Sequence, residues 1–371
     1  MLIKSLEQQD RALNVVWDDG VSQTLPYIWL RDNDPTELHP HTKERTFDLT
    51  SVDLNIKPVE VNSIQSELHI RWPQRDNDAI YSADWLRQHQ LGSNTSDPAR
   101  IQRQSWLGNE MTDIPRFSAT ACESPAGFIE ALTTLKRSGL VLITELADDP
   151  DAGAQFGERI GFKRESNFGV MFDVISKPDP NNLAYTSLAL PLHTDLPNQE
   201  FVPGFQFLHC YKNGATGGAS VFADGMAIVE AFAKRNPAGY ELLSNTDVPW
   251  RFHDESCDVR RHRPIIGIDK QGNFENFTFN AHLADVIDLP ESQVYAFYAA
   301  YQDLMNLVRE PEFRVAYPLQ PGEMVIFDNL RVMHGRDAFD PESGQRHLRG
   351  YYIEHNEIDS RIRVLAKALN S

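Results

Sequence analysis

The sequence has few cysteines, no long apolar run and a shortage of basic residues. Its three cysteines, Cys122, Cys210 and Cys257, are widely separated and form no Cys-x-x-Cys pair, so neither a disulfide framework nor a thiolate zinc site is indicated. Lys and Arg number 35 against 53 Asp and Glu, which gives a formal net charge of −18. This charge disfavours nucleic acid and anionic membranes as partners. We expect a protein that handles small molecules in a reducing compartment, the cytoplasm.

No stretch approaches the length of a transmembrane helix, and the opening MLIKSLEQQD lacks the apolar core of a signal peptide. The chain is 371 residues long, and 41% of its residues are hydrophobic and 10% aromatic. This length predicts one large domain and one smaller domain. The small polar stretch LGSNTSDPARIQ (91–102) is the best candidate boundary. We therefore expect a small β-rich domain over residues 1–92 and a larger domain over residues 93–371.

The larger domain shows a mainly β pattern with flanking helices. Apolar residues at helical spacing predict helices over 125–138, ending at Gly139, and over 291–309. Short apolar runs between Gly and Pro turns predict strands over 139–146, 204–211, 219–224, 322–329 and 347–354. Regular strand–helix alternation and a Gly-rich phosphate turn are both missing, which excludes a doubly wound sheet. The pattern favours a β-sandwich or barrel with helices packed outside.

The segment LPLHTDLP (190–197) contains a pair of polar residues that could bind a metal. On an extended chain, side chains two residues apart lie on one side, so His193 and Asp195 face the same way. With one distant histidine they would form the two-histidine, one-carboxylate set of non-haem Fe(II) enzymes. The same spacing recurs at His253-x-Glu255 and His355-x-Glu357. The spacing alone therefore decides nothing.

The surroundings of His334 favour it as the third ligand. In PGEMVIFDNLRVMHGRDAF a turn leads into an apolar strand, and His334 follows soon after. Arg346 comes twelve residues later, in QRHLRGYY, where an arginine could hold a carboxylate by two hydrogen bonds. By contrast, His253 lies in a charged stretch with no sheltering strand, and His355 lies in a polar tail region. We expect both of these histidines to be surface residues.

Several motifs, in order, resemble one enzyme family. They are WLRDN (29–33), NNLAYT (181–186), the LHTD segment, GFQFLHCYKNGATGGAS (204–220), FDNLRVMHGR (327–336) and RHLRGYY (346–352). Together they resemble the Fe(II)/2-oxoglutarate-dependent dioxygenases of the taurine dioxygenase superfamily, and within it the branch of γ-butyrobetaine and trimethyllysine dioxygenases. The resemblance covers nearly the whole chain. It implies a double-stranded β-helix, or jelly roll, for the larger domain.

The resemblance also implies roles for particular residues. His193, Asp195 and His334 would bind Fe(II), and Arg346 would pair with the distal carboxylate of 2-oxoglutarate, the co-substrate used with O₂. Ser220 or Thr216 would be its hydroxyl partner. The reaction would hydroxylate a substrate and release succinate and CO₂, with ascorbate as a supporting reductant. A homodimer is implied as well.

The substrate implied is a small cationic amine or betaine. A trimethylammonium group would lie among aromatic rings, held by cation–π attraction, and amides would hold the acid group. The matching aromatic positions are Phe168, Phe172, Tyr185 and Tyr352, and the matching amides are Asn182 and Asn280. The leading hypothesis is hydroxylation of γ-butyrobetaine to L-carnitine. The alternatives are another trimethylammonium compound, such as trimethyllysine or a phosphonate analogue, and a non-catalytic protein that binds small cations.

The chain departs from the family in its first domain. Members often carry a Cys-x-Cys-x-x-Cys zinc cluster directly after the LRDN motif. The corresponding positions here hold Asp34, Thr36 and His39, so no thiolate is available to zinc. His39 and the nearby His41 are expected to be exposed loop residues. We therefore predict no structural zinc and a domain held together by packing alone.

Overall fold

The computed structural model describes residues 2–73, 75–92, 97–111, 113–176 and 183–369. The chain divides into two compact units, Met1–Asp97 and Pro98–Ser371. The boundary expected after residue 92 adjoins residues 93–96, which lie outside the described part. Among the described residues, no helix combines the length and the apolar character needed to cross a bilayer.

The first unit contains two three-stranded antiparallel sheets, ordered β1-β2-β3 and β4-β5-β6. Their apolar side chains alternate along the strands, so that Leu13, Val15 and Trp17 of one sheet and Leu68 and Ile70 of the other are fully buried in a shared core. The elements are β1 (Ile3–Gln8), β2 (Ala12–Trp17), β3 (Ser22–Pro26), α1 (Tyr27–Asp32), η1 (Pro35–Glu37), η2 (Leu49–Ser51), β4 (Glu60–Ile64), β5 (Glu67–Arg71), β6 (Ala79–Ser82) and α2 (Ala83–Gln88).

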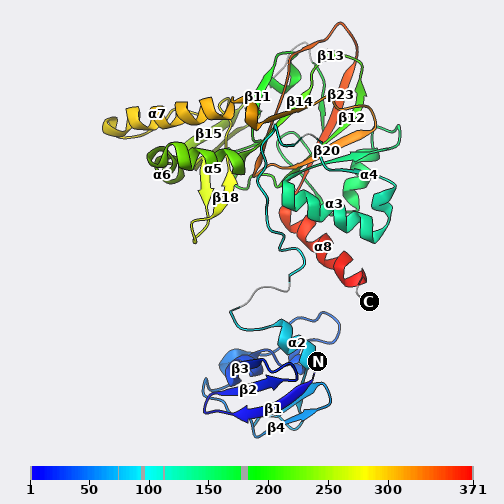
Figure 1. The fold of residues 1–371 in the computed structure, drawn as a ribbon, viewed down its shortest axis with the longest axis vertical. Coiled ribbons are helices and arrows are strands. Elements are labelled where there is room, and N and C mark those ends of the chain that lie inside the picture. Colours follow the sequence, from blue (N-terminus) through cyan, green and yellow to red (C-terminus); the bar gives the residue numbers. More distant parts are fainter. Residues whose placement is uncertain (1, 74, 93–96, 112, 177–182, 370–371) are drawn as a thin grey trace. The chain divides into compact units, whose positions relative to one another are not determined.

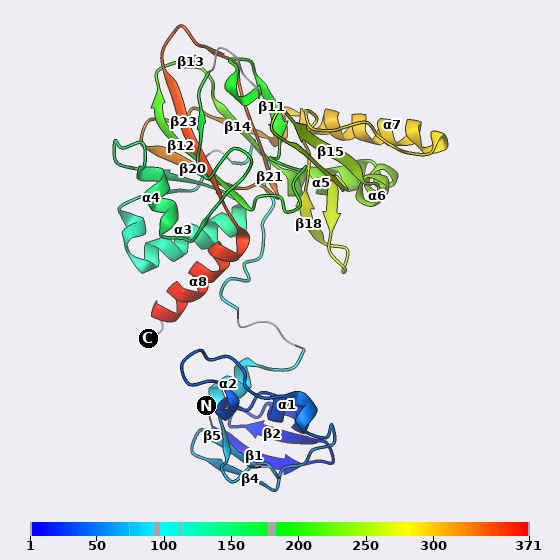
Figure 2. The same cartoon turned by 180° about the vertical axis from the view of Figure 1, so that it is seen from behind.

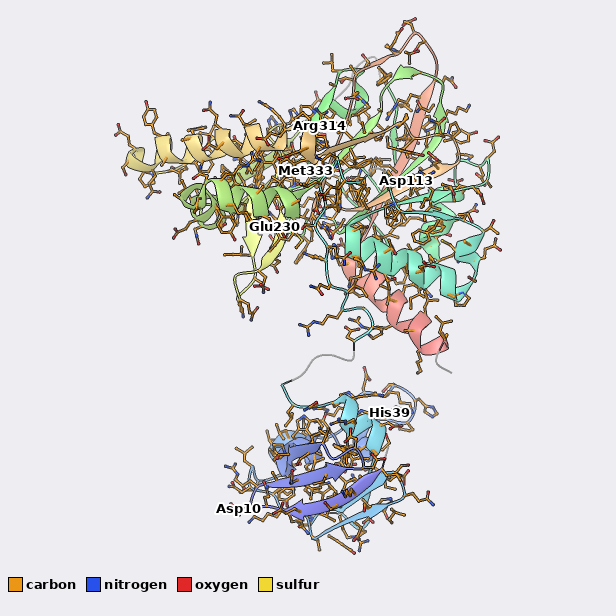
Figure 3. All side chains as sticks on the ribbon, in the orientation of Figure 1. Asp10, His39, Asp113, Glu230, Arg314 and Met333 are labelled. Carbon is orange, nitrogen blue, oxygen red and sulfur yellow. The ribbon has the colours of Figure 1, made fainter. Side chains whose placement is uncertain are left out.

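The positions that correspond to the family's zinc cysteines do not form a metal-binding set. Asp34 Oδ1 accepts hydrogen bonds from the backbone N–H of Thr36 at 2.9 Å and from its hydroxyl at 2.6 Å. His39 is exposed, as Figure 3 shows, and its Nδ1 accepts from the backbone N–H groups of His41 and Thr42. These residues do not fit a zinc ion, because their donor atoms serve the local backbone and no thiolate is present.

An ion-pair cluster of Arg31, Asp34, Glu37 and Arg75 occupies this region instead. Arg31 Nη2 lies 3.0 Å from Glu37 Oε1, and Arg75 Nη1 lies 2.6 Å from the same oxygen. Both guanidiniums also approach Asp34 Oδ2, at 3.7 and 3.6 Å. The Arg31 side chain is 5% exposed, and its guanidinium lies 4.0 Å from the centre of the Phe47 ring. Packing is therefore not the only force that holds this unit, because charge pairing contributes beneath its surface.

The second unit is built on two facing sheets, as Figures 1 and 2 show. The seven-stranded sheet has the order β10-β23-β12-β20-β8-β7, with β9 beside β23, and the four-stranded sheet has the order β11-β21-β14-β19. Pairs β13-β22, β15-β16 and β17-β18 complete the strands. The strands are β7 (Arg116–Ser118), β8 (Leu140–Thr144), β9 (Lys163–Arg164), β10 (Phe172–Val174), β11 (Leu190–His193), β12 (Phe205–Asn213), β13 (Thr216–Gly217), β14 (Ser220–Asp224), β15 (Val248–His253), β16 (Asp258–Arg263), β17 (Ile266–Ile268), β18 (Phe274–Phe277), β19 (Arg314–Tyr317), β20 (Glu323–Asp328), β21 (Val332–Arg336), β22 (Phe339–Asp340) and β23 (Arg346–Ile353).

Helices cover the outer faces of this unit. Figure 1 shows α3, α4 and α8 grouped on the side of β12 and β20, and α5, α6 and α7 on the opposite side with β15 and β18. The helices are η3 (Ala121–Glu123), α3 (Pro125–Ser138), α4 (Ala152–Glu158), η4 (Leu183–Tyr185), α5 (Gly225–Arg235), α6 (Pro237–Asn245), α7 (Glu291–Val308), η5 (Pro311–Phe313) and α8 (His355–Leu369). The jelly roll with flanking helices is thus confirmed.

The two-residue period of the strands directs side chains either to the helices or to the space between the sheets. On β12, Phe205 and Phe207 pack against α3 and α8, whereas Leu208 and Cys210 point between the sheets. On β23, Tyr351 and Ile353 pack with the helices. Arg346, Leu348 and Tyr352 alternate with them and line a cavity between the sheets. The sequence pattern therefore places polar residues at this cavity without breaking the apolar core.

Candidate metal centre and active site

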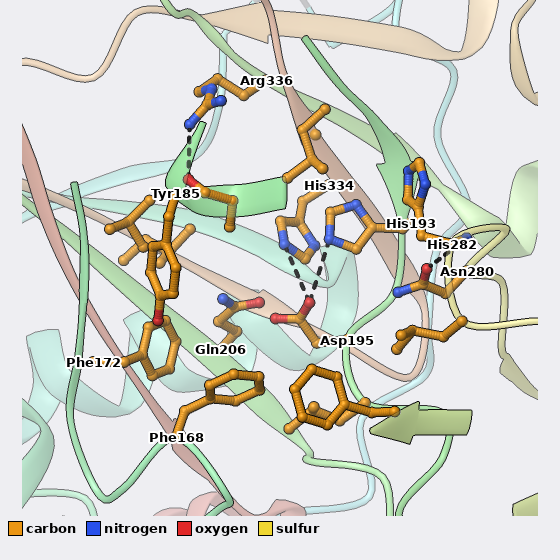
Figure 4. Close-up of a pocket in the computed structure, with 18 of the residues that line it drawn as sticks. Phe168, Phe172, Tyr185, His193, Asp195, Gln206, Asn280, His282, His334 and Arg336 are labelled. Carbon is orange, nitrogen blue, oxygen red and sulfur yellow. Dashed lines mark hydrogen bonds and ion pairs between the residues drawn. The ribbon is translucent and has the colours of Figure 1, made fainter. Parts of the chain in front are cut away.

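Two neighbouring strands bring three metal-binding side chains together. His193 ends β11, and it lies directly opposite His334 on the antiparallel β21, with ring centres 4.2 Å apart. Gly335 permits this approach, because a Cβ at that position would lie 2.5 Å from the Leu190 carbonyl oxygen. Asp195 follows β11 and turns back towards both rings (Figure 4). The long-range pairing of β11 with β21 therefore assembles the group.

The donor atoms of this triad lie close enough to share one ion. Asp195 Oδ1 is 3.3 Å from His193 Nε2 and 3.8 Å from His334 Nε2. All three potential ligand atoms lie within 4.8 Å of one another, and no other such group of three occurs among the described residues. His193 and His334 are 6% and 8% exposed. The triad is sheltered from bulk solvent, and its three side chains line the cavity between the sheets.

Electrostatics favour an ionised carboxylate at Asp195 and an unprotonated imidazole at His334, the forms that bind a metal. Burial raises the pKa of the Asp195 carboxyl, but the facing imidazoles of His334 and His193 and the hydrogen bond from the Tyr352 hydroxyl outweigh burial and lower it overall. Burial lowers the pKa of His334 to about 3, and His193 adds to this effect. His193 Nδ1 donates to the Pro191 carbonyl at 2.9 Å, which leaves Nε2 as the ligand atom. This donor set fits Fe(II) or a similar divalent ion.

Tyr352 contacts the carboxylate itself. Its hydroxyl donates to Asp195 Oδ2 at 2.7 Å, while Oδ1 faces the two histidines. Tyr352 is 3% exposed, and its ring lies 5.4 Å from that of Phe172. One side chain thus orients the carboxylate and also forms part of the cavity wall.

Arg346 lies in the same cavity and forms no ion pair with an acidic residue of the described part of the chain. Its Nη2 donates weakly to the Gly218 carbonyl at 3.4 Å, and its Nε has no hydrogen-bond partner within the described part of the chain. Burial, with repulsion from Arg336, lowers its pKa to about 10. Ser220 lines the cavity and is 5% exposed, whereas Thr216 is exposed and lies outside the lining. The region is suited to a small organic anion.

Arg336 was not identified from the sequence. It follows His334 by two residues on β21 and is 6% exposed. Its guanidinium donates to the carbonyls of Ala184, Thr186 and Leu188, at 3.2, 2.6 and 2.7 Å. Figure 4 shows it at the edge of the cavity above Tyr185. It therefore ties the metal-bearing strand to the segment that carries Tyr185.

Aromatic side chains form much of the wall of this cavity, which measures about 370 Å³. Phe168, Phe172, Tyr185 and Tyr352 all line it, together with Phe252, whose ring packs edge-on against Phe168 at 5.3 Å. The structure thus brings the four expected aromatic residues together and adds a fifth.

Of the two amides expected to hold the acid group of the substrate, only Asn280 lies among the described residues. Asn182 lies outside the described residues. Asn280 lines the cavity, where its Nδ2 donates to the Thr194 carbonyl and its Oδ1 accepts from the His282 N–H, both at 3.1 Å. Among the described residues the second amide hydrogen of Asn280 has no further partner and so is open to a ligand.

Other cavity residues were missed because no local motif marks them. They are Gln206, Arg251, His253 and His282. Gln206 is 2% exposed, and its Oε1 has no partner among the described residues. The expectation that His253 lacks a sheltering strand is wrong, because it ends β15, although its side chain is exposed. His355 is not a simple surface residue either, since its Nε2 lies 2.9 Å from the buried Asp328.

Comparisons with known proteins agree with this arrangement. A family model described as taurine catabolism dioxygenase TauD, TfdA family matches residues 107–352, and one described as gamma-butyrobetaine hydroxylase-like, N-terminal, matches residues 4–87. A gamma-butyrobetaine dioxygenase of Pseudomonas sp. (strain AK-1) is 36% identical over 363 residues, covering 96% of this chain and 94% of the relative. The Homo sapiens gamma-butyrobetaine dioxygenase is 30% identical over 393 residues, covering 100% and 98%.

Two further similarities are weaker. A trimethyllysine dioxygenase of Meyerozyma guilliermondii is 28% identical over 377 residues, covering 95% of this chain and 93% of the relative. The crystal structure of AAD-2 in complex with Mn(II) and N-oxalylglycine covers 68% of this chain and 97% of its own, with a TM-score of 0.53 and 16% identity. This last likeness shows the fold alone.

Proposed function

The chain belongs to the taurine catabolism dioxygenase TauD, TfdA family, and on that premise we propose that it hydroxylates γ-butyrobetaine to L-carnitine. It is an Fe(II)/2-oxoglutarate-dependent dioxygenase, with relatives named gamma-butyrobetaine dioxygenase along nearly its full length. The observation that carries the proposal is one cavity that contains a metal-binding triad, an aromatic wall and an arginine, Arg346, with no acidic partner among the described residues.

The triad is the proposed iron site. His193, Asp195 and His334 would hold Fe(II), and the bound iron with 2-oxoglutarate and O₂ supplies the oxidation that inserts a hydroxyl group and releases succinate and CO₂. The chain itself keeps Asp195 ionised and His334 unprotonated. It also shelters the metal from bulk water between two sheets.

Arg346 is the proposed partner of the distal carboxylate of 2-oxoglutarate. The buried guanidinium of Arg346 loses hydration that one long hydrogen bond to the Gly218 carbonyl replaces only in part, and its Nε has no partner among the described residues. A carboxylate ligand would restore this balance through charge-assisted hydrogen bonds. Ser220 is the better hydroxyl partner of the two that were considered, because it lines the cavity and Thr216 does not.

The aromatic wall is the proposed site of the trimethylammonium group. Phe168, Phe172, Tyr185 and Tyr352 offer ring faces to a cation that cannot donate hydrogen bonds. The free amide hydrogen of Asn280 is available to the substrate carboxylate, and Asn182 is proposed for the same role. Holding both ends of the molecule would present one C–H bond to the metal.

A panel of amines tests this proposal. Coupled turnover is measured as succinate released per hydroxylated product, with γ-butyrobetaine, trimethyllysine and a neutral isostere in which tert-butyl replaces trimethylammonium. Loss of the cation should raise KM by at least about tenfold, given about 2 kcal/mol for a desolvated cation–π contact. Faster coupled turnover of trimethyllysine would reassign the substrate to the second candidate, which the 28% identical relative favours. If no amine in the panel raises succinate release above the substrate-free rate, the proposed trimethylammonium substrate is wrong.

Assembly and location complete the proposal. A homodimer is supported by the family resemblance, and light scattering of the purified chain would measure its mass. A cytoplasmic location is supported by free cysteines, of which Cys122 and Cys210 are buried thiols.

A further inference from the structure

Asn329, in the short connection between β20 and β21, places its side-chain amide against the backbone of Asp195. The Asp195 N–H donates to Asn329 Oδ1 at 2.7 Å. Asn329 Nδ2 donates to the Asp195 carbonyl and to the Pro203 carbonyl, both at 3.1 Å. Asn329 is fully buried. A single side chain therefore holds both backbone polar groups of the residue that supplies the carboxylate.

The partners leave only one orientation for this amide. A backbone N–H can only donate and a carbonyl can only accept, so the Asn329 oxygen must face Asp195 N and its nitrogen must face the two carbonyls. The main chain is anchored as well, since the Asn329 N–H donates to the Gly204 carbonyl and the preceding Asp328 N–H donates to the Gly139 carbonyl, both at 2.8 Å. The amide is thus a fixed point at the end of the larger sheet.

The backbone next to Asp195 needs such a support. Leu196 has a φ of +55°, in the left-handed region that residues with a branched or bulky side chain rarely adopt. Leu196 is also 4% exposed and lines the cavity. Such conformations persist only where surrounding contacts enforce them. The hydrogen bonds from Asn329 act immediately before this strained residue.

Thr194, on the other side of Asp195, is held by a different segment. Its N–H donates to the Phe279 carbonyl at 2.7 Å, and its hydroxyl accepts from the Phe279 N–H at 3.0 Å. Phe279 is distant in sequence from the metal ligands, whereas Asn329 precedes His334 by only five residues in the same chain segment. It therefore links the two ligand-bearing segments directly.

We propose that Asn329 is a positioning residue of the iron site, which fixes the Asp195 carboxylate relative to His334 through the Asp195 backbone. The separation that it controls is the 3.8 Å between Asp195 Oδ1 and His334 Nε2. This inference rests on the proposed function, because it requires Asp195 to bind the metal. Outer partners that orient metal ligands typically change metal affinity by about 10–100-fold when they are lost.

The test is Mn(II) binding by the full chain in the presence of 2-oxoglutarate, followed by electron paramagnetic resonance. Asn329→Ala should bind Mn(II) about 10–100-fold more weakly than the unaltered chain. With Fe(II), it should also release more succinate per hydroxylated product, because a displaced carboxylate uncouples the two half-reactions. Asn236→Ala is the matched control. Asn236 caps α6 by accepting from the Gly239 N–H and donates to Asp303, both at 2.8 Å, and it does not line the cavity.

The control separates positioning from general stability. Asn236→Ala should lower the melting temperature with unchanged Mn(II) affinity and unchanged coupling. Should Asn329→Ala not fold, the isosteric Asn329→Asp takes its place, since it preserves the acceptor for the Asp195 N–H and replaces the donor by an oxygen that opposes the Asp195 and Pro203 carbonyls. Mn(II) affinity and coupling within twofold of the unaltered chain in the folded Asn329 variant would overturn the inference alone. Failure of the unaltered chain to bind Mn(II) with 2-oxoglutarate would instead overturn the proposed function and the inference together.

Discussion

Two sheltered aspartates, one in each unit, show what separates a metal site from a structural ion pair. Asp34 faces the guanidiniums of Arg31 and Arg75, so cations from the protein balance its charge. Asp195 faces two imidazoles and the Tyr352 hydroxyl, and no Lys or Arg in the described residues lies within ion-pair distance of it. A sheltered carboxylate without a Lys or Arg partner is suited to an external cation. Burial alone therefore does not distinguish a metal ligand from an aspartate in a structural ion pair. The absence of a Lys or Arg partner does.

A third aspartate fits the same rule. Asp224 and Arg331 are both fully buried and form a pair at 2.8 Å. Asp224 also accepts from the Trp106 and Met226 N–H groups. Its charge is balanced inside the protein, and among the described residues it belongs to no group of metal donors. Asp224 therefore resembles Asp34 rather than Asp195.

The largest effect is expected from Asp195→Ala, which removes the one ionised ligand. Fe(II) affinity should fall by more than the about 10–100-fold typical of losing an outer-shell partner, and hydroxylation should disappear. Equilibrium dialysis with Fe(II) under anaerobic conditions measures the change. Asp34→Asn is the matched control and should retain iron. If Asp195→Ala retained iron, Asp195 would not be a metal ligand and its contrast with Asp34 would be wrong.

A smaller effect is expected from Arg31→Met in the ion-pair cluster. This change leaves Asp34 buried with one cation fewer, and breaking such a pair typically costs about 3–5 kcal/mol of unfolding free energy. Hydrogen exchange of residues 2–92, analysed by mass spectrometry, would report the loss in this unit. Arg45→Met, which removes a half-exposed pair with Asp32, should change little. Equal effects of the two variants would show that the cluster adds no stability beyond a surface pair.

Tyr352→Phe should have the smallest effect and would sharpen the assignment of that residue. The ring remains for the cation, but the hydrogen bond to the Asp195 carboxylate is lost, and such bonds to charged groups contribute about 1.5–3 kcal/mol. We expect weaker Fe(II) binding with an unchanged KM for γ-butyrobetaine. A raised KM with unchanged Fe(II) affinity would limit Tyr352 to the aromatic wall.

Much of the fold could be predicted from local signals. The helix expected over 125–138 is α3, because Ser124 caps it, Pro125 opens it and Gly139 ends it in the left-handed conformation. The strands β15 and β16 were missed because the segment RFHDESCDVRRHR is rich in charged residues, although Val248, Trp250 and Phe252 of β15 alternate onto a buried apolar face. Sequence patterns therefore predict an element where apolar residues dominate the segment, and they fail where charged residues mask the alternation.

The candidate site could be predicted only in part. His193 and Asp195 share a segment with period two, and a sheltered strand drew attention to His334, which lies on its own strand, β21. Asn329 and Arg336 act through backbone groups that are distant in sequence. No residue type or spacing marks such contacts before the chain is folded.

Metal analysis of the full chain tests the central claim most directly. The protein is dialysed with Fe(II) and Zn(II) under anaerobic conditions, and the bound metals are counted per chain with and without 2-oxoglutarate. The account predicts one metal ion per chain, held by His193, Asp195 and His334, and none in the first unit. It also predicts that Fe(II) with 2-oxoglutarate gives a visible charge-transfer absorption. A second metal ion per chain that survives Asp195→Ala, or no absorption at saturating 2-oxoglutarate, would contradict it.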